Sequence, residues 1–238
     1  MNARRAAREL ALLTLYQLDR QKSGQGLLAA FRPEKEALEE LILSSVRALV
    51  NEAQEQIESA ARDMASVSQS LLEYEMDHPE NLKTPMDAPL QPVPIPTTRQ
   101  MIEKIERCLL AAEWLYEASR MPELASLAKR PEVREYAVAL IQHVLQNQPE
   151  LDEKINAVSS EWRVERMMKI DQYILRIAAS EMLYEKDVDI SVAIDEAVEL
   201  AKQYSEEESY RFINGVLGGL AGRSSELQSK LQNITQEA

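Results

Sequence analysis

Cysteine, glycine and phenylalanine are scarce in this sequence of 238 residues, which has one cysteine, six glycines and two phenylalanines. A single cysteine, Cys108, excludes an intrachain disulfide and a zinc site built from several cysteines. Its neighbours Ile105, Leu109 and Ala112 recur at helical spacing, so we expect Cys108 to be a small buried hydrophobe rather than a nucleophile. Few glycines together with abundant Ala, Leu and Glu favour helices over strands.

Long apolar runs and the common catalytic motifs are also missing. No stretch of 18 apolar residues predicts a transmembrane span, and the opening MNARRAAREL lacks the apolar core of a signal peptide, so we expect a cytoplasmic protein with no membrane partner. The sequence contains no Gly-rich phosphate loop, dinucleotide fingerprint or nucleophile elbow. His78 and His143 have no cysteine or second histidine at ligand spacing, so we expect no metal and no cofactor. Nothing in the sequence supports an enzyme.

Acidic residues outnumber basic ones, and the formal net charge is −13. Binding to nucleic-acid phosphates needs clustered Lys and Arg, so the overall charge argues against it. The acidity is concentrated, however. Twelve acidic and three basic residues lie between Glu34 and Glu80, a net charge of −9. The rest of the chain is closer to neutral, so the overall charge does not exclude a basic site there.

Apolar residues recur at helical spacing along almost the whole chain, which predicts an all-α protein. Helices are expected over residues 4–20, from Pro33 to about Met76, over 99–120, between Pro122 and Pro131, over 131–147, 164–185 and 191–204, and from the S-x-x-E capping box Ser205–Glu208 onward. We expect Pro149 to end a helix, because proline has no backbone N–H. Six of the ten prolines lie in residues 77–98, which predicts an extended linker there. Residues 226–238 are expected to be a frayed polar tail.

Three arginines, Arg4, Arg5 and Arg8, occupy the first turns of the first predicted helix. Positive charge opposes the macrodipole at a helix N-terminus, so a purely structural helix would favour acidic residues there. Phosphate binding is one interpretation of this cluster. A solvated terminus, with Arg5 paired to Glu9, is the other.

A second cluster lies in E-x-S-Y-R-F-I-N-G-V-L, from Glu207 to Leu217. Phe212 beside Arg211 is either a core side chain with a neighbouring exposed charge, or a stacking ring beside a phosphate-binding guanidinium. Gly215 costs the predicted helix about 1 kcal/mol. Close helix packing or contact with a ligand would explain it.

Four blocks of this sequence resemble, in order, the NusB family of transcription antitermination factors. The blocks are RRAARELALLTLYQLD at 4–19, IDQYILRIAASEML at 170–183, VAIDEAVELAKQY at 192–204 and SYRFINGVL at 209–217. The resemblance implies an all-α, two-subdomain helical bundle formed by residues 1–23 and 131–225. Residues 24–130 far exceed the family's usual connection. We expect them to form an inserted acidic helical hairpin with the proline-rich linker 77–98 at its turn, and the resemblance gives no role for it.

The resemblance also implies a non-enzymatic function. Family members bind the single-stranded boxA element of ribosomal RNA leader transcripts jointly with NusE, a ribosomal protein, and act on the transcription elongation complex. By similarity, the residues expected to contact RNA are Arg4, Arg5, Arg8, Arg176, Arg211 and Phe212. Those expected near the NusE surface are Tyr16, Asp171 and Glu208.

Two alternatives from other classes stay open. The RNA-binding domain fused to ribosomal RNA cytosine methyltransferases shares this helical fold, but an enzyme would need an α/β methyltransferase region that these 238 residues do not contain. A helical adaptor or oligomerisation protein built around the acidic hairpin would bind no RNA and would form a defined multimer.

Overall fold

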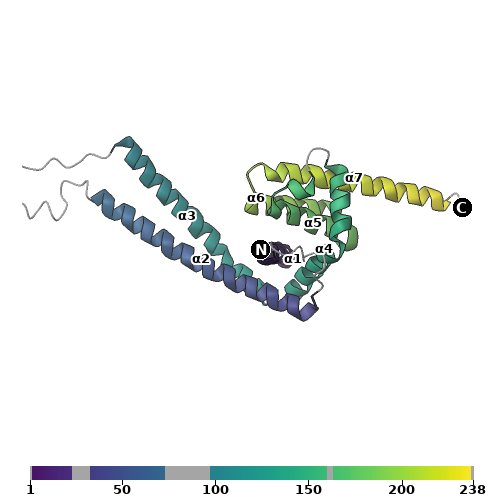
Figure 1. The fold of residues 1–238 in the computed structure, drawn as a ribbon, viewed down its shortest axis with the longest axis horizontal. Coiled ribbons are helices and arrows are strands. Elements are labelled where there is room, and N and C mark those ends of the chain that lie inside the picture. The colour runs from purple at the N-terminus through teal and green to yellow at the C-terminus, as the bar shows by residue number, and fades with distance from the viewer. Residues whose placement is uncertain (1, 23–32, 73–96, 160–162, 237–238) are drawn as a thin grey trace, which may run out of the picture. The chain divides into compact units, whose positions relative to one another are not determined.

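Every regular element of the protein that the structure describes is helical, and no strand occurs in those residues (Figure 1). The computed structural model describes residues 2–22, 33–72, 97–159 and 163–236, without the side chains of 21, 22, 72, 117 and 224–236. Its elements are α1 (Ala3–Lys22), α2 (Lys35–Leu72), α3 (Thr98–Leu127), α4 (Pro131–Val158), the 3-10 turn η3 (Val164–Arg166), α5 (Lys169–Tyr184), α6 (Ile190–Tyr204) and α7 (Ser209–Gln236). The predicted all-α class is confirmed.

The chain divides into two units. The bundle unit comprises residues 1–46 and 126–238, and the hairpin unit comprises residues 47–125. Helix α5 is the core of the bundle unit. All of its residues from Asp171 to Glu181 are buried, and it packs against α1, α4, α6 and α7. Because other helices surround α5, the polar side chains among its buried residues need partners on those helices. Helix α1 is buried along 6–12 and packs against α4 and α5.

Two prolines lie inside helices where the sequence predicted helix ends. Helices α3 and α4 continue through Pro122 and Pro149, so both predicted ends were wrong. An internal proline removes a backbone hydrogen bond and costs about 3 kcal/mol. Both prolines are exposed, so their rings point to the surface rather than into the packed side of the helix. The helices continue because later residues, such as Leu124 in α3 and Ile155 in α4, are fully buried.

Helices α5 and α7 begin later than predicted. Residues 164–166 form the separate turn η3, and α5 starts at Lys169. Ser205 does not cap α7; it ends α6, and its Oγ donates a hydrogen bond to Asp171 Oδ1 at 2.6 Å. A hydrogen bond from a hydroxyl to a carboxylate is charge-assisted, so it ties the end of α6 firmly to α5. Helix α7 then runs to Gln236, through most of the segment expected to be frayed.

Small side chains line the contact between α2 and α3 in the hairpin unit. Ala53 and Ala60 of α2 and Ala111 and Ala118 of α3 are buried, and Ala53 and Ala118 line a common pocket. Lys104 of α3 donates a hydrogen bond to the Ser70 hydroxyl of α2. Helix α2 is continuous through residues 66–70, where the sequence left room for a break. Residues 77–96 of the predicted linker lie outside the described residues.

The start of α3 carries a capping box that sequence analysis missed. Thr97 N donates to Gln100 Oε1 at 2.9 Å, and Gln100 N donates to Thr97 Oγ1 at 3.3 Å. This reciprocal pair is the T-x-x-Q form of the motif, and it satisfies two donors that the first turn otherwise leaves free. The motif directly follows the proline-rich segment.

The face of α3 that packs in the hairpin unit differs from the predicted one. The sequence predicted a buried stripe of Met101, Ile105, Cys108, Ala112 and Leu115. Ile105 and Ala112 are exposed and Cys108 is only half-buried, whereas the neighbouring alanines at 111 and 118 are buried. The apolar residues of α3 span a wider arc than one neighbouring helix can cover. The alanine side of α3 is the buried one, and the larger side chains lie outside it.

Candidate nucleic-acid interface

The three arginines of α1 lie in different environments although they share its first turns. Asn2 caps the helix, and its Oδ1 accepts a hydrogen bond from Arg5 N at 2.7 Å. Arg4 and Arg8 are four residues apart and lie on one side of the helix. Arg4 is exposed, but only 3% of Arg8 is exposed because it faces the bundle core. One turn of α1 therefore leads from the protein surface at Arg4 to the bundle core at Arg8.

Arg8 is held by a buried carboxylate. Its Nε donates to both carboxylate oxygens of Glu181 at 2.9 Å, and its Nη1 lies 3.7 Å from Glu196 Oε2. Burial alone would lower the pKa of Arg8, but the hydrogen bond and charge of Glu181 outweigh it and raise that pKa. Arg8 thus stays charged and ties α1 to α5 and α6. Its guanidinium is enclosed by these helices, so a direct phosphate contact does not fit this arrangement.

Tyr136 of α4 joins the same buried cluster. Its hydroxyl donates a hydrogen bond to Glu181 Oε1. Burial and the nearby charge of Glu181 both raise the pKa of Tyr136, so the hydroxyl keeps its proton and remains a donor. On the other side of the ring, the guanidinium carbon of Arg4 lies 5.5 Å from the ring centroid, and Arg4 Nη1 donates to the Asp187 carbonyl oxygen at 3.2 Å.

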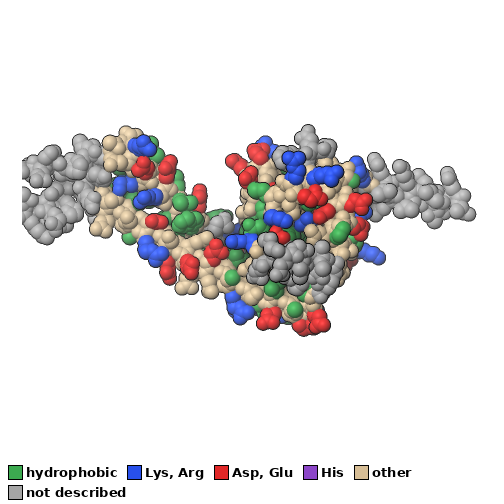
Figure 2. Space-filling view, in the orientation of Figure 1, with side chains coloured by type: hydrophobic (Ala, Val, Ile, Leu, Met, Phe, Trp, Pro, Cys, Tyr) green, Lys and Arg blue, Asp and Glu red, His purple; other side chains and the backbone are tan. Residues whose placement is uncertain are grey.

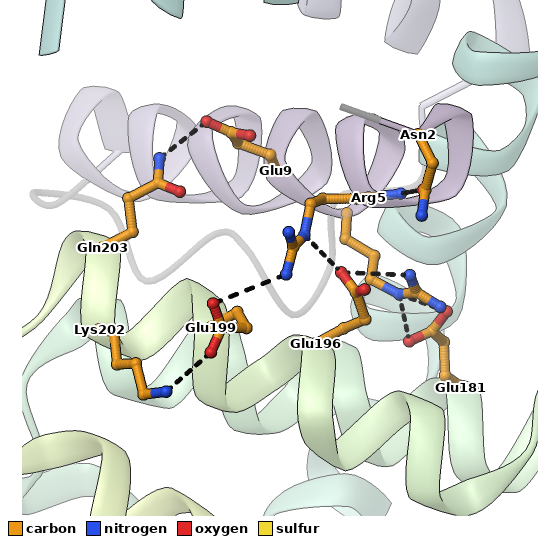
Figure 3. Close-up of polar contacts among 9 residues, drawn as sticks. Asn2, Arg5, Glu9, Glu181, Glu196, Glu199, Lys202 and Gln203 are labelled. Carbon is orange, nitrogen blue, oxygen red and sulfur yellow. Dashed lines mark hydrogen bonds and ion pairs between the residues drawn. The ribbon is translucent and has the colours of Figure 1, made fainter. Parts of the chain in front are cut away.

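Arg5 reaches from α1 to the carboxylates of α6 (Figure 3). Its Nε donates to Glu196 Oε2 at 2.9 Å, and its Nη2 lies 3.8 Å from Glu199 Oε2. Glu199 also accepts a hydrogen bond from Lys202 at 2.8 Å, and that bond holds the pKa of Glu199 below its usual value. Arg5 is half-exposed, so it lies at the surface beside two carboxylates with which a phosphate would compete.

The expected pairing of Arg5 with Glu9 does not form. Glu9 is buried and points away from Arg5 toward Gln203, whose Nε2 donates to it at 2.9 Å (Figure 3). Glu9 also accepts a hydrogen bond from the Tyr204 hydroxyl. Both partners lie at the end of α6. Residues 5 and 9 share a helix face, but α6 runs alongside α1 and supplies a different partner to each.

Arg176, another expected RNA contact, is buried in the bundle unit. Its Nε and Nη2 donate to the two carboxylate oxygens of Asp152 at 2.7 and 2.9 Å. Its guanidinium carbon lies 5.3 Å from the ring centroid of Tyr173. This bidentate pair joins α4 to α5. The planar guanidinium group of arginine matches a carboxylate through two parallel hydrogen bonds. Arg176 therefore supports the bundle from within and, like Arg8, is not placed to touch a phosphate directly.

Arg211 and Phe212 lie in the first turn of α7. Arg211 is exposed, and its Nη1 and Nε donate to Glu208 Oε2 at 2.8 Å and to the Tyr210 hydroxyl at 3.1 Å. The hydrogen bond with Tyr210 and the charge of Glu208 raise the pKa of Arg211. Phe212 is half-buried, so part of its ring remains available to stack on a base. This placement is compatible with either interpretation of the Arg211–Phe212 pair.

The residues expected near a protein partner also divide between surface and core. Tyr16 is half-buried and Glu208 is exposed. Asp171 is buried and accepts hydrogen bonds from the hydroxyls of Ser205 at 2.6 Å and Ser209 at 3.3 Å. Burial raises the pKa of Asp171 despite these bonds. Asp171 thus fixes the turn between α6 and α7 rather than presenting its carboxylate to a partner.

Sequence analysis missed the carboxylates that organise these arginines. None of Glu181, Glu196 and Asp152 was singled out from the sequence alone. Glu181 gave a signal, since it stands in the apolar run IAASEML, where a buried acid requires a cationic partner. Arg8 gave the matching signal between Ala7 and Leu10. Their pairing could not be read from sequence, because they lie 173 residues apart.

Two further properties concern only the described part of the chain. It contains no group of three or more His, Cys, Asp or Glu side chains placed to hold a metal ion. None of its helices combines the length and the apolar content that crossing a membrane requires.

The geometry defines an all-α protein whose charged side chains divide into a buried set that ties helices together and a surface set on α1, α6 and α7. Residues 99–221 match the model of the NusB family. The chain is 39% identical over 216 residues to "Transcription antitermination protein NusB" of Crocosphaera subtropica, covering 90% of this chain and 92% of that protein. The protein of the same name from Gloeothece citriformis is 39% identical over 214 residues, covering 90% and 91%. This chain belongs to the NusB family of transcription antitermination proteins.

The hairpin unit is shared with these relatives. An alignment that covers 90% of this chain and 92% of a relative must include most of residues 47–125. The family match also begins at Arg99, within α3. The solved structure of T. maritima NusB is 32% identical and covers 43% of this chain and 75% of its own, with a TM-score of 0.38.

Proposed function

We propose that this protein is a non-catalytic antitermination factor that binds single-stranded boxA-type RNA of ribosomal RNA leader transcripts together with the ribosomal protein NusE, within the transcription elongation complex. The observation that carries the proposal is the 39% identity, over 90% of the chain, to proteins named for transcription antitermination. The exposed arginines of the bundle unit are consistent with it, because single-stranded RNA is bound by guanidinium groups and stacking rings.

In this proposal the expected RNA residues have two kinds of role. Arg4, Arg5 and Arg211 neutralise phosphates, since all three reach the surface, and Phe212 stacks on an unpaired base. Arg8 and Arg176 act as positioning residues, because their ion pairs hold α1, α4 and α5 in register.

The expected partner residues divide in the same way. In this proposal Tyr16 and Glu208 contact NusE. Asp171 holds the turn from which Glu208 projects, through its bonds to Ser205 and Ser209.

The test is the affinity for a fluorescently labelled boxA-type RNA, with and without NusE. Affinity should rise with NusE and fall on the order of 10-fold between about 50 and 200 mM salt, the effect of about three phosphate contacts to a single strand. The variant Arg211→Ala/Phe212→Ala should bind about 10-fold more weakly or worse. Arg99→Ala, which removes an exposed arginine from the hairpin unit, is the control. Equal losses in the two variants, or no binding with NusE present, would refute the proposal.

Glu199→Gln should strengthen RNA binding by about 2- to 5-fold, the scale of a surface ion pair. The carboxylate of Glu199 lies beside both Arg5 and Lys202, so its removal frees two cations for phosphate. Asp195→Asn removes the same charge from an exposed position of the same helix and serves as the control. A gain of equal size in the control would mean that only net charge matters, and a loss in Glu199→Gln would contradict the role of Arg5.

A further inference from the structure

Tyr210, in the first turn of α7, lies beside two cationic side chains. The Nζ of Lys202, near the end of α6, lies 5.6 Å from the centroid of the Tyr210 ring. The guanidinium carbon of Arg211 lies 5.6 Å from the same centroid, and Arg211 Nε donates to the Tyr210 hydroxyl at 3.1 Å. The two charges therefore lie on the order of one Debye length apart, about 10 Å at moderate salt. They act together on any ligand that reaches them.

An aromatic ring holds a cation differently from a carboxylate. The ring attracts the cation through its quadrupole, but it is neutral and so leaves the positive charge in place. Like charges repel, so two cations that share one ring are unfavourable by themselves, and an anion beside them would relieve the repulsion. The contact between α6 and α7 at Tyr210 therefore has the charge arrangement of an anion site.

Each of the two cations also has a carboxylate partner three residues earlier in the chain. Lys202 donates to Glu199 at 2.8 Å, and Arg211 donates to Glu208 at 2.8 Å. The side chains of Lys202 and Arg211 are 49% and 67% exposed. Water screens exposed ion pairs and makes them weak, so a phosphate can take the place of either carboxylate.

Lys202 also connects this site to the arginines of α1. Glu199 lies 3.8 Å from Arg5 Nη2 and 2.8 Å from Lys202 Nζ (Figure 3). Lys202 in turn contacts the Tyr210 ring, which also contacts Arg211. Basic and acidic side chains are interspersed on the face of the bundle unit that Figure 2 shows, so net charge alone does not mark a path there. The succession of contacts does, from α1 across α6 to α7.

We propose that Lys202 is a further RNA-binding residue, and that Tyr210 is a positioning residue that holds Lys202 and Arg211 along one RNA backbone. This inference rests on the proposed RNA-binding function of the bundle unit. Lys202 neutralises a phosphate between those bound by Arg5 and Arg211. Its ammonium group contacts phosphate oxygens and no base, so its contribution does not depend on the RNA sequence.

The test measures the affinity of the full chain for two labelled single-stranded RNAs, one of boxA type and one with the same bases in scrambled order, with and without NusE. Lys202→Ala should weaken binding of both RNAs by about 2- to 5-fold, the scale of one exposed charge contact. It should also reduce the slope of log affinity against log salt by about 0.7, the value for one phosphate of a single strand.

Two further lysine variants serve as controls. Lys202→Arg keeps the cation and should bind both RNAs as the wild type does. Lys154→Ala removes another lysine of the bundle unit that is paired with a carboxylate, at 3.5 Å from Glu150, and should leave both affinities and the salt slope unchanged.

Variants of Tyr210 test its positioning role. Tyr210→Phe keeps the ring and should bind within about 2-fold of the wild type. Tyr210→Leu removes the ring but keeps an apolar side chain, and should weaken both RNAs about as much as Lys202→Ala. Adding Lys202→Ala to Tyr210→Leu should cost less than it does in the wild type, because the two residues act together. Circular dichroism and thermal unfolding check that each variant keeps its fold.

Three results would overturn the inference. They are equal losses in Lys154→Ala and Lys202→Ala, equal losses in Tyr210→Phe and Tyr210→Leu, and a loss in Lys202→Ala that occurs only with NusE, which would place Lys202 at the protein partner. The scrambled RNA separates this inference from the proposed function. Equal binding of both RNAs by the wild type would refute boxA recognition, but Lys202 would stand if its removal weakens both. A wild type that binds neither RNA would refute both.

Discussion

Replacing Glu181 with alanine is expected to lower the free energy of unfolding of the bundle unit by about 3–5 kcal/mol, the cost of leaving a buried charge without its partner. Arg8 is 3% exposed, and its Nη2 already has no hydrogen-bond partner in the described residues. Removal of Glu181 would also strand the Tyr136 hydroxyl. Urea unfolding measures the loss, and hydrogen exchange of α5 amides locates it in the bundle unit.

A double variant tests whether Arg8 and Glu181 affect the stability of the bundle unit as a pair. Arg8→Met/Glu181→Leu replaces both charges with apolar side chains of similar size, and such replacements are often neutral or stabilising. The double variant should therefore be clearly more stable than Glu181→Ala and less destabilised than the sum of Arg8→Met and Glu181→Leu. Additive losses would show that the two side chains do not act as a pair.

Replacing Asp152 with alanine is expected to cost about 1.5–3 kcal/mol, the range for hydrogen bonds to charged groups. The loss is smaller than for Glu181 because Asp152 is partly exposed and water can reach the space it leaves. Arg176, which is buried, would keep no carboxylate partner. Thermal and urea unfolding measure the change.

Two variants control for this second prediction. Asp152→Asn keeps one acceptor oxygen and should lose less than Asp152→Ala. Glu153→Ala removes an exposed carboxylate from the next position and should change stability by no more than about 0.5 kcal/mol. A loss in Glu153→Ala equal to that in Asp152→Ala would mean that general charge, not the bidentate pair, determines stability.

The helices of this protein could be predicted because their signal is local. Apolar spacing identified α1, α2, α6 and the all-α class, and four sequence blocks identified the family. Helix ends were harder to predict, because tertiary packing overrides the local tendency of proline to end a helix. Pro122 and Pro149 would end isolated helices, but buried side chains beyond them keep α3 and α4 continuous.

The candidate site was predicted only in part, for a physical reason. Sequence shows which residues are cationic but not which of them face a carboxylate. Arg4 and Arg8 look equivalent along α1, and the difference between them is made by Glu181, which lies far away in the sequence. Exposed groups such as Arg211 need no distant partner, so their placement at the surface follows from the local pattern of α7.

The long sequence separation of these pairs has a consequence for synthesis on the ribosome. Glu181, the partner of Arg8, is translated 173 residues after it. Gln203, a partner of Glu9, is translated 194 residues after Glu9. At about 5–20 residues per second, α1 emerges roughly 10–40 s before its last partners exist. The hairpin unit, residues 47–125, is translated wholly within that interval. The nascent chain therefore has a complete hairpin while the apolar side of α1 is still uncovered, and this is the stage at which a chaperone would be most useful.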